Sequence, residues 1–177
     1  MKNTKFLLVF FLLLFNFQVK AESTIAYVDL KLVMNKSKPG IFIKDRIKIT
    51  TEKFDKKFSA IAVNLKDKEN NLLKKKNLIE QNEFENKITE LKSEINDYNQ
   101  KKNKAQKELR DSIIQINANL LKKIEPILID YADSKKISIL LQKKNIILGS
   151  KELDATQDII LIVNEKININ DFKWAIL

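Results

Sequence analysis

The feature that most limits the fold of this chain is a long stretch without glycine. From about Ile41 to Asp133 there is no Gly, and Pro126 is the only Pro. Gly and Pro are the residues that most often interrupt helices, and this stretch is rich in Lys, Glu, Leu, Ile and Asn. The sequence therefore predicts either one very long helix or two long helices joined by a short turn.

The apolar residues of this stretch form two series with alternating spacings of four and three. The series are Phe54, Phe58, Ile61, Leu65, Leu72, Ile79 and then Phe84, Ile88, Leu91, Ile95, Tyr98, Ala105, Leu109. Such spacing places each series along one side of a helix, as in helices that pair with each other. The two series are out of phase, because Ile79 and Phe84 are five residues apart.

Two structures explain the change of phase. One is a stutter within a single continuous helix, which would be ~135 Å long at 1.5 Å per residue. The other is a hairpin with its tip near residues 80–83, whose second helix returns antiparallel to the first. We favour the hairpin, because there each apolar stripe buries the other, and we assign residues 47–110 to this arm.

Short strands are expected on either side of the arm. Residues 24–30 and 136–141 are rich in Ile, Leu and Val, and residues 146–148 follow a polar turn at 143–145. Runs of this kind predict buried strands. We expect residues 22–46 and 111–177 to form one body into which the arm is inserted, which is an α+β fold with a small β-rich body.

Helical segments complete this body. Beyond Leu109 the apolar stripe widens, so we expect the return helix to enter the body, and Pro126 to bend or end it. Asp154 and Gln157 have the spacing of a capping box, which predicts a short helix from Ala155 to about Lys166. Residues 167–177 are apolar but carry no pattern, and they support no prediction.

The N-terminus resembles a secretory signal peptide. Lys2 and Lys5 precede an apolar run over residues 6–15, and the segment ends in small or short residues before a cleavage site after Ala21. We therefore expect a protein exported to the bacterial periplasm. The signal contains three Lys and no acid, so removing it lowers the net charge from +10 to +7.

Several classes of function are excluded by composition. The chain has no His and no Cys, so it can form neither a Ser-His-Asp triad nor the usual zinc site. Gly40 and Gly149 lie too far apart for a phosphate-binding loop. We expect no enzyme activity, no cofactor and no metal.

The arm and the body both have thin cores. Continuing the spacing of the arm places Lys68, Lys75 and Lys102 where apolar residues are expected. These lysines either extend along a solvated coiled coil or leave a cationic and apolar surface that binds another molecule. The few short strands of the body leave unpaired edges, which predicts a homo-oligomer.

The order of these parts resembles the Skp (OmpH-like) family of periplasmic chaperones. The strand Ile25–Asp29 follows the signal peptide, and the hairpin is followed by Ile137–Leu141, Ile146–Leu148 and the helix that begins near Asp154. The resemblance covers nearly the whole mature chain and ends near Lys166. It implies a jellyfish-like trimer whose arms enclose unfolded outer-membrane β-barrel proteins without ATP.

The candidate interaction residues fall into two sets. Client-binding or arm-packing candidates are Phe54, Phe58, Ile61, Phe84, Ile88, Tyr98, Lys68, Lys75 and Lys102. Oligomerisation candidates are Ile25, Tyr27, Ile137, Ile139 and Leu141.

Two other functions remain open. A structural coiled-coil or adaptor protein of the envelope would pair its arms with one specific partner. A polyanion binder would use the lysines to contact lipopolysaccharide or anionic lipid. Nucleic acid is not an expected partner, because the basic regions lack interleaved aromatics and the chain is exported.

Overall fold

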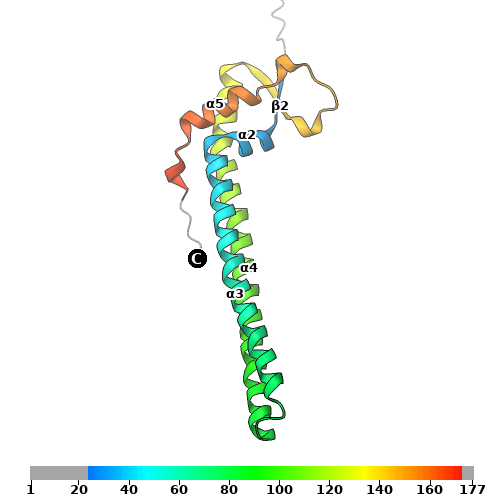
Figure 1. The fold of residues 1–177 in the computed structure, drawn as a ribbon. Helices are drawn as coiled ribbons and strands as arrows, with labels where there is room; N and C mark the ends of the chain where they lie inside the picture. Colours follow the sequence, from blue (N-terminus) through cyan, green and yellow to red (C-terminus); the bar gives the residue numbers. More distant parts are fainter. Residues whose placement is uncertain (1–23, 173–177) are drawn as a thin grey trace, which may run out of the picture.

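The computed structural model describes residues 24–172, which form a small head and a long arm (Figure 1). The expected signal peptide, residues 1–21, and its cleavage site lie outside the described residues. The arm consists of α3 (Lys38–Lys75) and α4 (Gln81–Ser134), which lie side by side as an antiparallel hairpin. This confirms the predicted hairpin and excludes the continuous helix.

The turn of the hairpin lies at residues 76–80, a few residues before the expected tip. Glu80 is the extended N-cap residue of α4, so the expected tip at 80–83 instead lies in the first turn of that helix. Acidic side chains such as Glu83 are favourable near a helix N-terminus, because they complement its partial positive charge. The polar residues taken for a turn therefore begin a helix.

The arm begins at a tightly packed break in the chain. The short helix α2 (Leu30–Lys36) ends just before Ser37, whose side chain accepts a hydrogen bond from the Gly40 N–H at 3.3 Å. Pro39 lies in the first turn of α3, where a missing N–H costs nothing. A Cβ on Gly40 would lie 1.6 Å from the Met34 carbonyl oxygen, so only glycine fits here.

The sheet of the head has two parallel strands, β1 (Thr24–Val28) and β2 (Ile137–Gln142). The small sheet and the long hairpin confirm the predicted α+β fold. The prediction of a further strand at residues 146–148 is wrong. Residues 143–145 form a 3-10 helix, and residues 146–148 pair with no strand among the described residues. The other edge of β1 is partly taken by a bridge between Tyr27 and Asp154, which leaves little room for another strand there.

The head core joins the sheet, α2, the roots of both arm helices and α5 (Thr156–Lys166). Its most deeply buried residues are Val28, Val33, Ile43, Leu120, Ile124, Ile159 and Val163. Pro126 does not end α4, which continues to Ser134. Ile124 and Ile127 on either side of it are buried in this core and hold the helix in place.

The described chain ends in a segment that we name the strap, residues 167–172. It leaves α5, contains the 3-10 turn η3 (Ile169–Asp171), and lies beside the root of the arm (Figure 1). Its first and last side chains, Ile167 and Phe172, are buried in the head core. The strap therefore belongs to the fold, although the sequence pattern did not show it.

Candidate interaction surfaces

One face of the small sheet carries exposed aliphatic side chains. In a parallel pair, residues in register point to the same side, which places Ile25 with Ile139 and Tyr27 with Leu141. Ile25, Ile139 and Leu141 are 43%, 48% and 40% exposed. Ile137 at the start of β2 instead packs partly against the head core. Three of the five oligomerisation candidates thus form an apolar surface that residues 24–172 leave uncovered.

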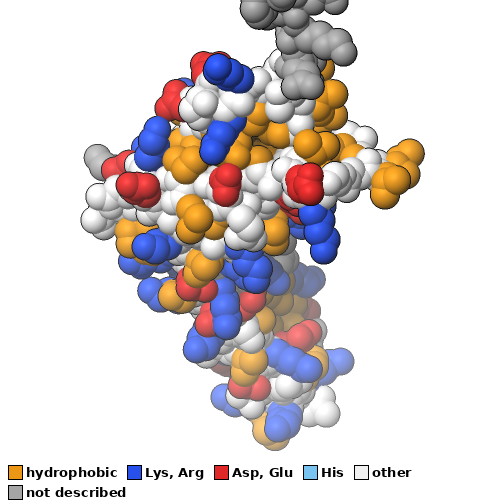
Figure 2. Space-filling model, turned by 90° about the horizontal axis from the view of Figure 1, so that it is seen from above, with side chains coloured by type: hydrophobic (Ala, Val, Ile, Leu, Met, Phe, Trp, Pro, Cys, Tyr) orange, Lys and Arg blue, Asp and Glu red, His pale blue; other side chains and the backbone are white. Residues whose placement is uncertain are grey.

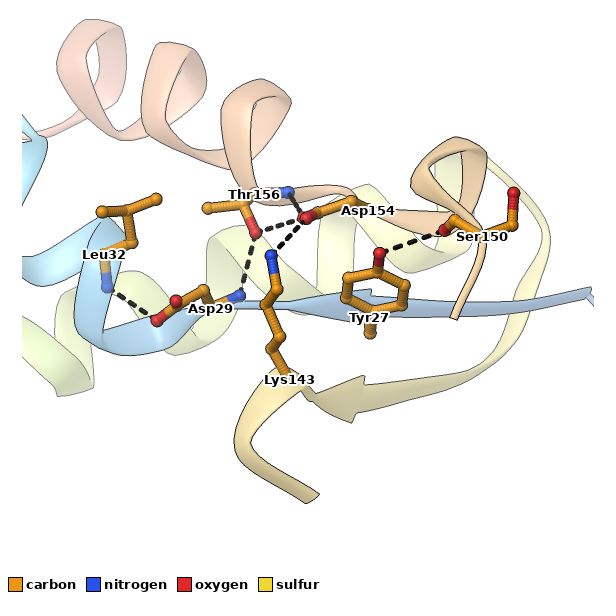
Figure 3. A network of polar contacts seen from close by, with 7 residues as sticks. All are labelled: Tyr27, Asp29, Leu32, Lys143, Ser150, Asp154 and Thr156. Atoms are coloured by element: carbon orange, nitrogen blue, oxygen red, sulfur yellow. Dashed lines mark hydrogen bonds and ion pairs between the residues drawn. The ribbon is translucent and has the colours of Figure 1, made fainter. Parts of the chain in front are cut away.

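Tyr27, on the same face, is covered by the chain itself. Its hydroxyl donates a hydrogen bond to the Ser150 carbonyl at 3.0 Å, and the Lys143 ammonium lies 5.6 Å from the ring centre (Figure 3). Gly149 packs so closely that an added Cβ would lie 2.8 Å from the ring. Tyr27 thus holds the 143–150 segment against the sheet, and its ring is not part of the exposed surface.

A polar network fixes the base of this segment (Figure 3). Asp154 accepts hydrogen bonds from the Thr156 N–H at 3.0 Å, from the Thr156 hydroxyl, and from Lys143 Nζ at 2.9 Å. The Thr156 hydroxyl oxygen in turn accepts from the Asp29 N–H at 2.9 Å. The network joins the end of β1, the start of α5 and the segment after β2.

The environment lowers the pKa of the Asp154 carboxyl. Burial by itself would raise that pKa, but the hydrogen bonds from Thr156 and the ion pair with Lys143 outweigh it. The same hydrogen bond raises the pKa of the Lys143 ammonium. Both groups are charged at neutral pH, so the network is an ion pair there.

The segment held by this network carries the most exposed aliphatic residues of the head. Ile147 and Leu148 are 105% and 91% exposed. Seen from above, hydrophobic side chains gather over the head, and one group projects at the edge of the view (Figure 2). Together with Ile25, Ile139 and Leu141 these side chains form what we name the head patch. Exposed apolar side chains gathered on one part of a protein are typical of protein–protein contacts.

The aromatic candidates of the arm lie mainly in the seam between its helices. Phe54 and Phe58 are buried, with ring centres 4.6 Å apart, and Tyr98 of α4 lies 6.0 Å from Phe58. Nearer the tip, Phe84 and Ile88 are half-buried and pack against Leu65, Leu72 and Leu91. These five candidates therefore serve arm packing in the free chain. Ile61, at 39% exposed, is the one apolar candidate of the arm that largely faces solvent.

The three lysine candidates border the seam. Lys68 pairs with Glu94 across the hairpin at 2.6 Å, with both side chains about half exposed. Lys68 and Lys75 line one shallow groove of the arm together with Leu72 and Leu91. Lys102 lies 5.7 Å from the Tyr98 ring centre. The apolar seam is therefore narrow and edged by cations.

Two surfaces were missed by sequence reasoning. Ile114 and Leu121 belong to the widened stripe beyond Leu109, yet they are 60% and 42% exposed on α4. Their spacing of seven residues is a signal that could have marked a second stripe. The strap and its groove had no periodic signal.

Within residues 24–172 no group of three or more Asp and Glu side chains is placed to hold a metal ion. None of the helices described is long and apolar enough to cross a membrane.

Comparison with known proteins agrees with this architecture. Residues 24–162 match the family described as outer membrane protein, OmpH-like. A crystal structure of an OmpH-like candidate outer membrane chaperone from Caulobacter crescentus CB15 superposes with a TM-score of 0.77. It is 18% identical, and the match covers 83% of this chain and 87% of that one, so it shows the shared fold. No curated protein matches the chain.

Proposed function

The chain belongs to the OmpH-like family, and on that basis we propose that it is an ATP-independent periplasmic holdase. In this proposal it captures unfolded outer-membrane β-barrel proteins between its arms and prevents their aggregation. The family is one of chaperones, and the expected signal peptide would deliver the chain to the periplasm.

The observation that carries this proposal is the arm. It is a two-helix hairpin with a narrow seam, so exposed aliphatic residues such as Ile61, Val63 and Leu73 lie among lysines along its surface. A narrow seam buries little apolar area, and such segments have low local stability. Many weak contacts of this kind can hold an unfolded chain without imposing one structure on it.

Oligomerisation is the second part of the proposal. We expect a trimer joined through the head patch, because that patch is apolar and uncovered in the single chain. The outer edge of β2 is also without a strand partner within the described residues. Three subunits of net charge +7 would attract acidic clients and contact anionic lipid or lipopolysaccharide.

Sedimentation of the mature chain, Glu22–Leu177, with a urea-denatured outer-membrane β-barrel protein tests this function. We expect a trimer that keeps the diluted client soluble in a defined complex. A monomer or dimer that lets the client precipitate would refute the holdase and favour the envelope adaptor. The same run without client gives the oligomeric state independently.

A further inference from the structure

The strap lies along α4 and is held by charge at both ends. Lys166, which precedes it, pairs with Asp130 of α4 at 3.1 Å, and Asp171 pairs with Lys123 at 2.9 Å. From the start of the strap to its end, the paired residue of α4 changes from Asp130 to Lys123. The strap therefore runs antiparallel to α4, from the head towards the arm (Figure 1).

Two apolar side chains anchor the strap. Ile167 and Phe172 are 8% and 7% exposed. Both line a groove of about 710 Å³ together with Ile116 and Ile127 of α4. The strap forms one wall of this groove, and Asn119, Lys122 and Pro126 of α4 line another, so open space remains beside the docked strap.

The attachment of the strap is weak. Both ion pairs are exposed, and such pairs contribute about 0–1 kcal/mol. Apart from the bond from the Ile167 N–H to the Val163 carbonyl of α5, the backbone hydrogen bonds described for the strap lie within it. Two buried side chains, two solvated ion pairs and the contacts of η3 with α3 thus hold the strap in place. Such an attachment allows exchange with another ligand of the same chemistry.

We propose that the surface of α4 that the strap covers, together with the adjoining groove, is a peptide-binding site and that the strap is its resident occupant. The ligand it fits is an extended segment of unfolded polypeptide with an aliphatic and an aromatic residue about five positions apart and an acidic residue beside the aromatic. Lys122, Lys123 and Lys166 at the groove complement the acidic group. That such segments come from held clients rests on the proposed function; the site itself does not.

The test measures binding of a labelled peptide with the sequence of residues 167–172 to three full-chain proteins. These are the wild type, the released variant Asp171→Lys/Phe172→Ser, and the control Asn170→Ser. Asn170 is on the strap, but it is exposed and does not belong to the head core. A strap docked about ten times more often than free lowers the apparent affinity of a competitor about elevenfold.

We therefore expect the released variant to bind the peptide about tenfold more tightly than the wild type and the control. Adding Lys123→Glu to the released variant should abolish this gain. Equal binding by all three proteins, or no binding to the released variant, would overturn the inference. Circular dichroism verifies folding, and Phe172→Ser alone replaces the double variant if that variant unfolds.

A parallel assay of client solubility separates this inference from the proposed function. Peptide binding without client holding would refute the holdase and leave the groove. Client holding without peptide binding would refute the peptide-binding site and leave the holdase.

Discussion

Removing the Phe58 side chain should loosen the middle of the arm and leave the head unchanged. Phe58 is 4% exposed and packs on Phe54 and Tyr98 across the seam. Truncating a buried Phe to Ala costs ~3–5 kcal/mol. Only two helices enclose this site, so water can enter the space, and we take the lower end, about 3 kcal/mol.

Amide hydrogen exchange can locate this loss. A cost of about 3 kcal/mol corresponds to exchange faster by about a hundredfold, as each 1.4 kcal/mol is tenfold. We expect this acceleration in residues 54–62 and 95–109, with no change in β1 and α5. The matched control is Ile61→Ala, one turn away and already 39% exposed, which should accelerate exchange less than about fivefold.

Two results would contradict the reasoning. If Phe58→Ala exchanged like the control, the seam would not depend on its aromatic contacts. If the head lost protection equally, the arm and the head would unfold as one unit rather than separately.

Three further predictions concern the head and the charge of the chain. Ile139→Asp should dissociate the oligomer in sedimentation without loss of helix by circular dichroism, because it places a charge in the head patch. Ile114→Asp, at a more exposed site on α4, is its control, and an oligomer that survives Ile139→Asp would place the interface elsewhere. Asp154→Asn should lower the free energy of unfolding by about 1–2 kcal/mol at neutral pH, since it removes a charged hydrogen-bond acceptor. The folded-state pKa of Asp154 is lowered, so its contribution is complete above the usual value of 3.8 and is lost as the pH falls below it. Melting temperatures of wild type and variant should therefore converge in acid, and Glu152→Gln should show no such effect. Client affinity should fall as salt rises, because charge attraction is screened within about 8–10 Å at physiological ionic strength; an affinity independent of salt would indicate purely apolar capture.

The parts of the fold that have a regular spacing of apolar residues were predictable from the sequence. The parts that depend on single contacts were not. The seam follows from spacings of four and three, which place the apolar residues along one side of each helix, whereas the change of phase after Ile79 fitted both a stutter and a hairpin. The prediction of a strand at residues 146–148 was wrong because an apolar run forms a strand only beside the free edge of another strand. Asp154 already lies along the second edge of β1. The strap has two anchors five residues apart, a spacing typical of neither helix nor strand. Tyr27 lies on the same face of β1 as Ile25, as the alternation of the strand predicts. It is nevertheless covered by Gly149 and Ser150, and no local sequence pattern indicates that contact.

The parallel pairing of β1 with β2 has a consequence for the order of folding. The two strands lie on either side of the arm in the sequence, and the hydrogen bond from Tyr27 to Ser150 spans 123 residues. Closing so long a loop from an unstructured chain is slow, because its entropy is lost before any contact is gained. The helical hairpin shortens that search, since its formation from local contacts brings Lys38 and Ser134 to the same end of the arm. The arm should therefore form first, and the head should close only after β2 can pair with β1.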